Sequence, residues 1–179
     1  MSQQRSEEQK EPRASRPAMQ GYGVPDSTEG MLPWRFARER LERARNYWVC
    51  TVRPDGRPHA VPVWAVWVGN ALYFGTAPTS QKARNLATNP AVVVHLESGD
   101  EVVIVEGTAE PAGSLPAELF EQIGDAYAAK YEGYRPESPA GQYVVRPRVV
   151  YGWREFPADA TRWRFGRRTG PAVAPGRLA

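Results

Sequence analysis

The stretch from Ala71 to Pro90, ALYFGTAPTSQKARNLATNP, is the part of this chain that decides its fold. It begins as a short apolar strand, passes through small and hydroxyl-bearing residues, and continues into a helix that we expect Ser80 to cap. Lys82 and Arg84 fall in the first turn of that helix, where free backbone N–H groups and a partial positive charge attract anions. The pattern is typical of a phosphate site, and equally of a capped surface helix whose cations are solvated.

Short strands and tight turns surround this stretch. The PDGR segment at 54–57 and the pair Gly69-Asn70 are typical hairpin turns, and helical spacing of apolar residues predicts helices over 33–45 and 114–131. We expect seven antiparallel strands, over residues 46–52, 59–68, 71–76, 91–97, 101–110, 144–156 and 161–166. Many short strands with few helices favour a mainly β (α+β) fold, a small barrel of six to seven strands.

The second of these strands, HAVPVWAVWV at 59–68, is apolar on both of its alternating faces. A half-exposed strand alternates with polar residues instead, so both faces of this one should be covered. The barrel interior covers one face, and a flat ligand or a second subunit is the natural cover for the other. Pro62 lacks an N–H donor, which suits an edge strand or a strand that pauses beside a ligand.

The length of 179 residues fits one domain with tails. We expect a disordered tail over 1–30, a single domain over 31–167 and a flexible tail over 168–179, because both ends are polar or rich in Pro, Gly and Ala. The N-terminus has no apolar segment of the signal-peptide kind, and no apolar run is long enough to span a membrane. We therefore expect a cytoplasmic protein that does not contact membranes.

Several chemistries lack support in the residues. A single cysteine, Cys50, excludes an internal disulfide, and neither His59 nor His95 has Cys, Asp or Glu at the spacing of metal ligands, so we expect no metal. His59 follows Pro58 at a strand start, where it should be a partly exposed residue able to reach a cofactor edge. The arginines from Arg162 onward follow no DNA-binding motif, so we expect no nucleic-acid partner.

The order of these pieces resembles the pyridoxamine-5′-phosphate-oxidase-like split β-barrel family, including its flavin- and deazaflavin-dependent oxidoreductases. Three pieces carry the resemblance: NYWVCTVRPDGRPHAVPVW at 46–64 is similar to the family's opening hairpin, ALYFGT to its third strand, and SQKARNLATNP at 80–90 to the helix that holds the cofactor phosphate. The resemblance covers about residues 45–107, with a weaker likeness over 144–165. It implies a homodimer with the cofactor ring at the subunit interface.

The resemblance also implies roles for individual residues. Thr76, Ser80, Lys82 and Asn85 would hold the cofactor phosphate, with Arg84 or Arg57 nearby, and Val61, Pro62, Val63 and Trp64 would line the tricyclic ring. Trp163 and Arg164 lie where some members close the site. No residue stands out as an essential acid or base, so the catalytic residues stay unassigned.

The implied function is an oxidoreductase that uses the deazaflavin coenzyme F420, or FMN, to transfer hydride to or from a small electron-poor organic substrate. The short hairpin and the SQKARNL helix are more similar to the F420 branch, which makes F420 the preferred cofactor. The C-terminal pattern that binds substrate phosphate in a true pyridoxamine-phosphate oxidase is missing, so oxidation of vitamin B6 is not expected. The alternative is a protein of the same fold that binds, stores or senses a flavin, a deazaflavin or haem without turnover.

Overall fold

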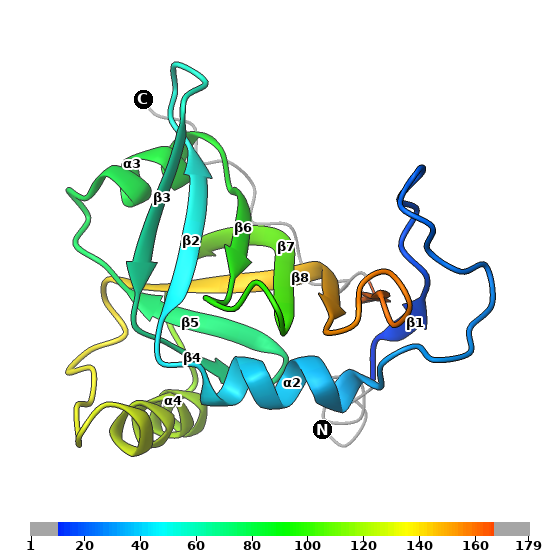
Figure 1. Cartoon of the computed structure of the whole chain (residues 1–179). Coiled ribbons are helices and arrows are strands. Elements are labelled where there is room, and N and C mark those ends of the chain that lie inside the picture. The colour runs from blue at the N-terminus through cyan, green and yellow to red at the C-terminus, as the bar shows by residue number, and fades with distance from the viewer. Residues whose placement is uncertain (1–10, 167–179) are drawn as a thin grey trace.

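The computed structural model describes residues 11–166 and contains nine strands and three helices in that range (Figure 1). The strands are β1 (Arg13–Ser15), β2 (Tyr47–Val52), β3 (Pro58–Val63), β4 (Ala65–Val68), β5 (Ala71–Gly75), β6 (Ala91–His95), β7 (Val102–Pro111), β8 (Gln142–Trp153) and β9 (Thr161–Arg164). The helices are α2 (Trp34–Arg43), α3 (Gln81–Thr88) and α4 (Ala117–Lys130).

Every strand pairing is antiparallel, and seven strands follow one another in the order β1-β9-β8-β7-β6-β2-β3. Strand β5 leaves this path by pairing with β4 on one side and with the first part of β8 on the other. The sheet therefore curls round at β8, which gives the mainly β barrel that the strand pattern predicts. Strand β3 is an edge strand, because within the described residues it pairs only with β2.

Two apolar cores hold this arrangement. The larger fills the barrel and joins helix α2 to the inward side chains of the long sheet, with Trp34, Phe74 and Trp163 among its members. The smaller lies where α4 packs on β4, and its buried rings are Tyr73, Tyr127 and Tyr131. Helix α3 lies apart from the other two helices, α2 and α4, and beside the β2–β3 hairpin (Figure 1). The start of α3 and the edge strand β3 thus flank the same part of β2.

Local sequence signals are confirmed at two turns. Ser80 caps α3, and its hydroxyl oxygen accepts a hydrogen bond of 3.2 Å from the backbone N–H of Ala83. Gly69 and Asn70 join β4 to β5 with φ angles of 57° and 59°, the left-handed conformation that a tight two-residue hairpin needs. The expected helices also form, over shorter ranges than 33–45 and 114–131.

The structure corrects the expected strand count at two places. Strand β1 lies within the tail that we expected to be disordered over 1–30, and it pairs with β9 at the edge of the sheet. Arg16 anchors the chain after β1, since its guanidinium donates to the carbonyls of Ser27, Ala158 and Ala160 at 2.7–3.0 Å. The expectation is therefore wrong for residues 11–30. Residues 1–10 and the expected tail over 168–179 lie outside the described residues.

The expected strand over 59–68 is in fact two strands with different partners. Strand β3 pairs with β2, whereas β4 pairs with β5, and Trp64 lies at the break between them. The apolar residues of the two halves therefore face different surroundings. Strand β3 alternates between exposed and half-buried residues, and three of the four residues of β4 are buried.

Candidate cofactor site

The first turn of helix α3 offers hydrogen-bond donors that no group among the described residues accepts from. Backbone N–H groups of Ser80, Ala83 and Arg84 donate to the carbonyl of Ala77, to the Ser80 hydroxyl and to the Ser80 carbonyl. Those of Gln81 and Lys82 have no acceptor within residues 11–166. Two N–H groups at the positive end of a helix are therefore available to an anion.

Hydroxyl groups lie beside these donors. The Thr76 and Ser80 hydroxyl oxygens are 2.9 Å apart, and both side chains are half-buried. The loop that carries Thr76 is held in place, because the Thr76 backbone N–H donates to the carbonyl of Gly141 at 2.9 Å. The structure thus brings together three of the predicted phosphate ligands, Thr76, Ser80 and Lys82, around one helix end.

Three basic side chains gather at this end of the molecule. Lys82 is half-buried, and burial lowers the pKa of its ammonium. Burial also lowers the pKa of His59, and the positive charges of Arg53 and Lys82 lower it further, so both charges lie near the imidazole. None of the three forms an ion pair within the part of the chain that the structure describes. Two cationic side chains and an imidazole that form no ion pair are an arrangement suited to binding an anion.

Arg53 and His59 are functional candidates that sequence reasoning left out of the predicted phosphate site. Arg53 directly follows β2 and His59 lies at the start of β3, 28 and 22 residues before Gln81, the first residue of α3. The resemblance pointed instead to Arg57 in the same hairpin. Arg57 is exposed at the turn and pairs with Asp55 at 2.7 Å, so its charge is already matched.

The two remaining predicted phosphate residues, Asn85 and Arg84, form hydrogen bonds to other groups of the protein. Asn85 is fully buried; its amide nitrogen donates to the Thr51 hydroxyl at 2.9 Å, and its amide oxygen accepts from Gln81 at 2.7 Å. Asn85 therefore fastens α3 to β2 and does not face solvent. Arg84 is exposed, and its guanidinium donates to the carbonyl of Thr79 and to Gln81.

The four residues predicted to line the ring lie along β3 and at its end. Val61 and Val63 pair with Val49 and Tyr47 of β2, whose side chains are buried, so both valines face the barrel side of the sheet. Pro62 faces the other way and is exposed. This settles which face of the strand is outward.

Trp64 is the one aromatic residue among these four, and 45% of its surface is accessible to solvent. It stacks on Tyr131 of the α4 end with ring centroids 4.6 Å apart and planes within 11°. The Arg45 guanidinium lies 5.7 Å from the Trp64 ring centre. Trp64 is therefore a fixed aromatic surface at the end of β3, and a planar ligand can stack on such a surface.

Beneath Trp64 lies a buried basic and phenolic cluster that the sequence pattern did not indicate. The Lys130 ammonium donates to the Tyr47 hydroxyl at 2.7 Å and to the Ala65 carbonyl at 3.2 Å. Burial lowers the pKa of Lys130 to about 8, and it raises the pKa values of Tyr47 and Tyr131. These groups join α4 to the sheet, since the Tyr131 hydroxyl also bonds to the backbone of Ala65.

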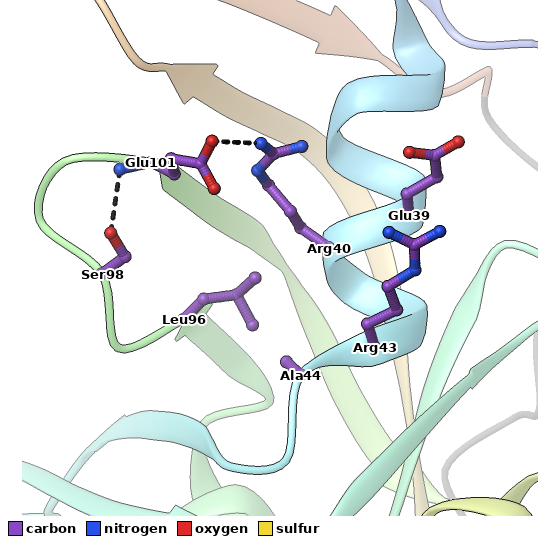
Figure 2. A pocket seen from close by; sticks show the side chains of 7 residues that line it. All are labelled: Glu39, Arg40, Arg43, Ala44, Leu96, Ser98 and Glu101. Carbon is purple, nitrogen blue, oxygen red and sulfur yellow. Dashed lines mark hydrogen bonds and ion pairs between the residues drawn. The ribbon is translucent and has the colours of Figure 1, made fainter.

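A separate hollow of about 330 Å³ lies between the end of α2 and the β6–β7 turn, and Figure 2 shows its lining. Arg40 is held there by Glu101, and Glu101 in turn donates its backbone N–H to the Ser98 hydroxyl at 2.8 Å. None of the predicted site residues lines this hollow. It is a polar surface depression remote from α3.

Within residues 11–166 no three or more His, Cys, Asp or Glu side chains come together in a way that could hold a metal ion. None of the helices in that range has the length and apolar character that crossing a membrane requires.

The resemblance placed Trp163 near the closure of the site. Trp163 is instead buried in the barrel, where its ring centroid lies 5.6 Å from that of Trp34.

Three solved structures are similar to this chain to different degrees. An F420 reductase is 29% identical over 63% of this chain and 94% of its own, with a TM-score of 0.47. A haem binding protein from Mycobacterium smegmatis is 19% identical over 73% of this chain and 58% of its own, with a TM-score of 0.56. A conserved hypothetical protein from Mycobacterium tuberculosis is 24% identical over 84% and 96%, with a TM-score of 0.53.

No curated protein matches the chain in sequence. The family model described as pyridoxamine 5′-phosphate oxidase does match, over residues 34–154, from the start of α2 to just after β8. That range contains the hairpin, the capped helix and the curled antiparallel sheet that carried the resemblance. The chain therefore belongs to the pyridoxamine 5′-phosphate oxidase family.

Proposed function

We propose that this protein binds a phosphate-bearing tricyclic redox cofactor between the start of α3 and the edge strand β3. F420 is the preferred cofactor and FMN the second choice. With it the protein would transfer hydride to or from a small electron-poor organic substrate. The preference for F420 comes from the resemblance of the short hairpin and the SQKARNL helix to the F420 branch of the family.

The observation that carries this proposal is the group of basic side chains, Arg53, His59 and Lys82, beside the first turn of α3. None of the three forms an ion pair within residues 11–166, although the charge of Arg53 also acts on Asp55, and two backbone N–H groups lie at the same helix end. Leaving such groups unmatched costs stability unless an anion occupies the site in the working protein. A phosphate supplies the charge and the acceptor oxygens that these donors lack. The residues therefore fit the phosphate of FMN or F420.

The ring would lie along β3 toward Trp64. The free edge of β3 offers backbone N–H and C=O groups, which can hydrogen-bond to the polar rim of a flavin or deazaflavin. Pro62 and Trp64 add exposed apolar surface at the same strand end. Val61 and Val63 contribute through the strand edge, because their side chains face the barrel.

The cofactor supplies the hydride chemistry, and the chain supplies binding and orientation. No side chain at this site is assigned as an acid or base. A protein of this fold that binds the same cofactor without turnover is the competing function, and a redox assay distinguishes the two.

The test is a fluorescence titration of purified protein with F420, FMN and riboflavin, which lacks the phosphate. We expect F420 to bind most tightly, FMN less tightly and riboflavin least. Strong binding of FMN with no binding of F420 would overturn the cofactor preference, and binding of neither would overturn the enzyme. Faster reoxidation of the reduced cofactor on adding quinones or enones supports turnover, whereas an unchanged rate supports the binding protein.

We also propose that two copies associate through the outward face of the long sheet. Register aligns one row of outward residues across it: Pro62, Trp48, His95, Ile104, Tyr151 and Arg162. Four of the six are apolar and five are half-buried in the single chain, and an apolar sheet face usually marks an interface. A homodimer through this face is the assembly that the resemblance implies.

A further inference from the structure

A continuous line of side-chain hydrogen bonds runs from the surface of α3 to the edge strand β3. Arg84 donates to the Gln81 amide oxygen at 3.0 Å, and the Gln81 amide nitrogen donates to the Asn85 oxygen at 2.7 Å. The Asn85 nitrogen donates to the Thr51 hydroxyl at 2.9 Å, and Thr51 lies 3.4 Å from Nδ1 of His59. This line of hydrogen bonds therefore ends at His59, one of the three basic side chains beside α3.

The chemistry of Arg84 fixes the direction of the hydrogen bonds from Arg84 to Thr51, and the burial of Thr51 fixes the last bond, to His59. A guanidinium can only donate, so Gln81 must present its oxygen to Arg84 and its nitrogen to Asn85. Asn85 must then present its nitrogen to Thr51. The Thr51 oxygen accepts that bond; Thr51 is buried, and within residues 11–166 the only other hydrogen-bond partner of its hydroxyl is Nδ1 of His59, so its hydrogen donates to Nδ1. Nδ1 is thus an acceptor, and the imidazole proton resides on Nε2.

The other ring nitrogen of His59, Nε2, forms no hydrogen bond to any group within residues 11–166, whereas Nδ1 lies beside the buried Thr51. The charged groups whose fields reach the imidazole are Arg53 and Lys82, both cations. Asp55, in the same hairpin turn, is occupied by Arg57. Burial and the two cations lower the pKa of His59, which favours the neutral ring.

We propose that Arg84 fixes the tautomer of His59 through this line of bonds, and that Nε2–H of His59 is a donor to the phosphate beside Arg53 and Lys82. Arg84 and Asn85 are then positioning residues, which act on the anion through His59 and do not touch it. The phosphate contact rests on the proposed function, whereas the tautomer does not depend on any ligand.

The two histidines of the chain give this proposal an internal contrast. Nδ1 of His95 lies 2.8 Å from the Leu96 carbonyl oxygen, which can only accept, so His95 carries its proton on Nδ1. Long-range ¹H–¹⁵N correlation spectra of untagged, ¹⁵N-labelled protein at pH 7 distinguish the two tautomers. We expect Nε2–H at His59 and Nδ1–H at His95, with the assignment made from His95→Gln. A proton on Nδ1 of His59, or a charged His59 ring, would overturn the proposal.

A substitution that reverses the donors and acceptors of these hydrogen bonds tests the direction we assign to them. In Gln81→Glu the carboxylate still accepts from Arg84 but cannot donate to Asn85, so the Asn85 amide must turn over and accept from Thr51. His59 should then change to the Nδ1–H tautomer, and its ¹⁵N pattern should match that of His95. Gln122→Glu makes the same chemical change at an exposed position of α4 and should leave His59 unaltered. An unaltered His59 in Gln81→Glu would refute the relay.

Titration with inorganic phosphate tests the contact itself. The Nε2 resonance of His59 should move as the site fills, and the His95 resonances should not. If His59 stays unmoved while FMN or F420 still binds, the phosphate contact is wrong and the proposed function stands. If neither cofactor binds and the predicted tautomers are found, the proposed function is wrong and the role of Arg84 stands.

Discussion

Replacing Lys82 with methionine should weaken cofactor binding without weakening the fold. The ammonium is half-buried and has no acceptor or ion-pair partner within residues 11–166, so its burial costs stability in the free protein. Methionine has a similar length and no charge to desolvate. We therefore expect the free energy of unfolding of the cofactor-free protein to stay the same or to rise.

The affinity should change in the opposite direction. A charge-assisted hydrogen bond to phosphate contributes about 1.5–3 kcal/mol, which is roughly a tenfold to hundredfold change in Kd. Fluorescence titration with F420 and with FMN measures this loss, and urea denaturation of the free protein measures stability. Because part of the attraction is electrostatic, the difference between parent and variant should shrink as salt is added.

A matched variant controls for net charge. Arg35→Ala also removes one positive charge, from an exposed side chain of α2 that is only loosely paired with Glu39 at 3.9 Å. It should bind both cofactors as tightly as the parent. If Lys82→Met also binds within about twofold of the parent, the cations of α3 are simply solvated and the phosphate site is wrong. A marked loss of stability in Lys82→Met would show that the ammonium has a structural partner instead.

Three further changes test other parts of the structure. Asn85→Ala should lower the free energy of unfolding by about 1–3 kcal/mol in urea denaturation, since it leaves buried partners on α3 and β2 unsatisfied; an unchanged midpoint would show that this link carries no stability. Lys130 has a pKa of about 8 in the folded protein against 10.5 normally, so the unfolded chain binds more protons between these values and stability should rise with pH there. After allowance for solvent screening we expect a rise of about 1–2 kcal/mol, which Lys130→Met should abolish; equal slopes for parent and variant would contradict this. Ile104→Arg on the outward sheet face should give a monomer in sedimentation velocity, and a parent that already sediments as a monomer would rule out the homodimer.

Features set by neighbouring residues were predictable from the sequence. The cap at Ser80 needs only a hydroxyl three residues before a free N–H, and the turn at Gly69-Asn70 needs only residues that tolerate positive φ. The periodic apolar residues of α2 and α4 likewise identify those helices. The barrel class followed from the number and length of the strands, and the family match confirms it.

Features that depend on residues distant in the sequence could not be predicted from it. Asn85 was expected to face a phosphate, but its partner Thr51 lies on a strand 34 residues earlier, and only the folded chain shows that the two meet in a buried place. The apolar run 59–68 reads as one strand because composition cannot show that its two halves pair with different neighbours. Strand β1 was missed because so short a segment, Arg13-Ala14-Ser15, forms a strand only through the edge that β9 supplies.

The position of the long strand β8 determines how the domain unfolds. It pairs with β7 along most of its length, with β5 near its start and with β9 near its end, so it borders both parts of the curled sheet. Neither part can open fully without breaking hydrogen bonds to β8. The two apolar cores should therefore melt together, and the slowest-exchanging amide hydrogens should be those of β8, released only when the whole domain unfolds.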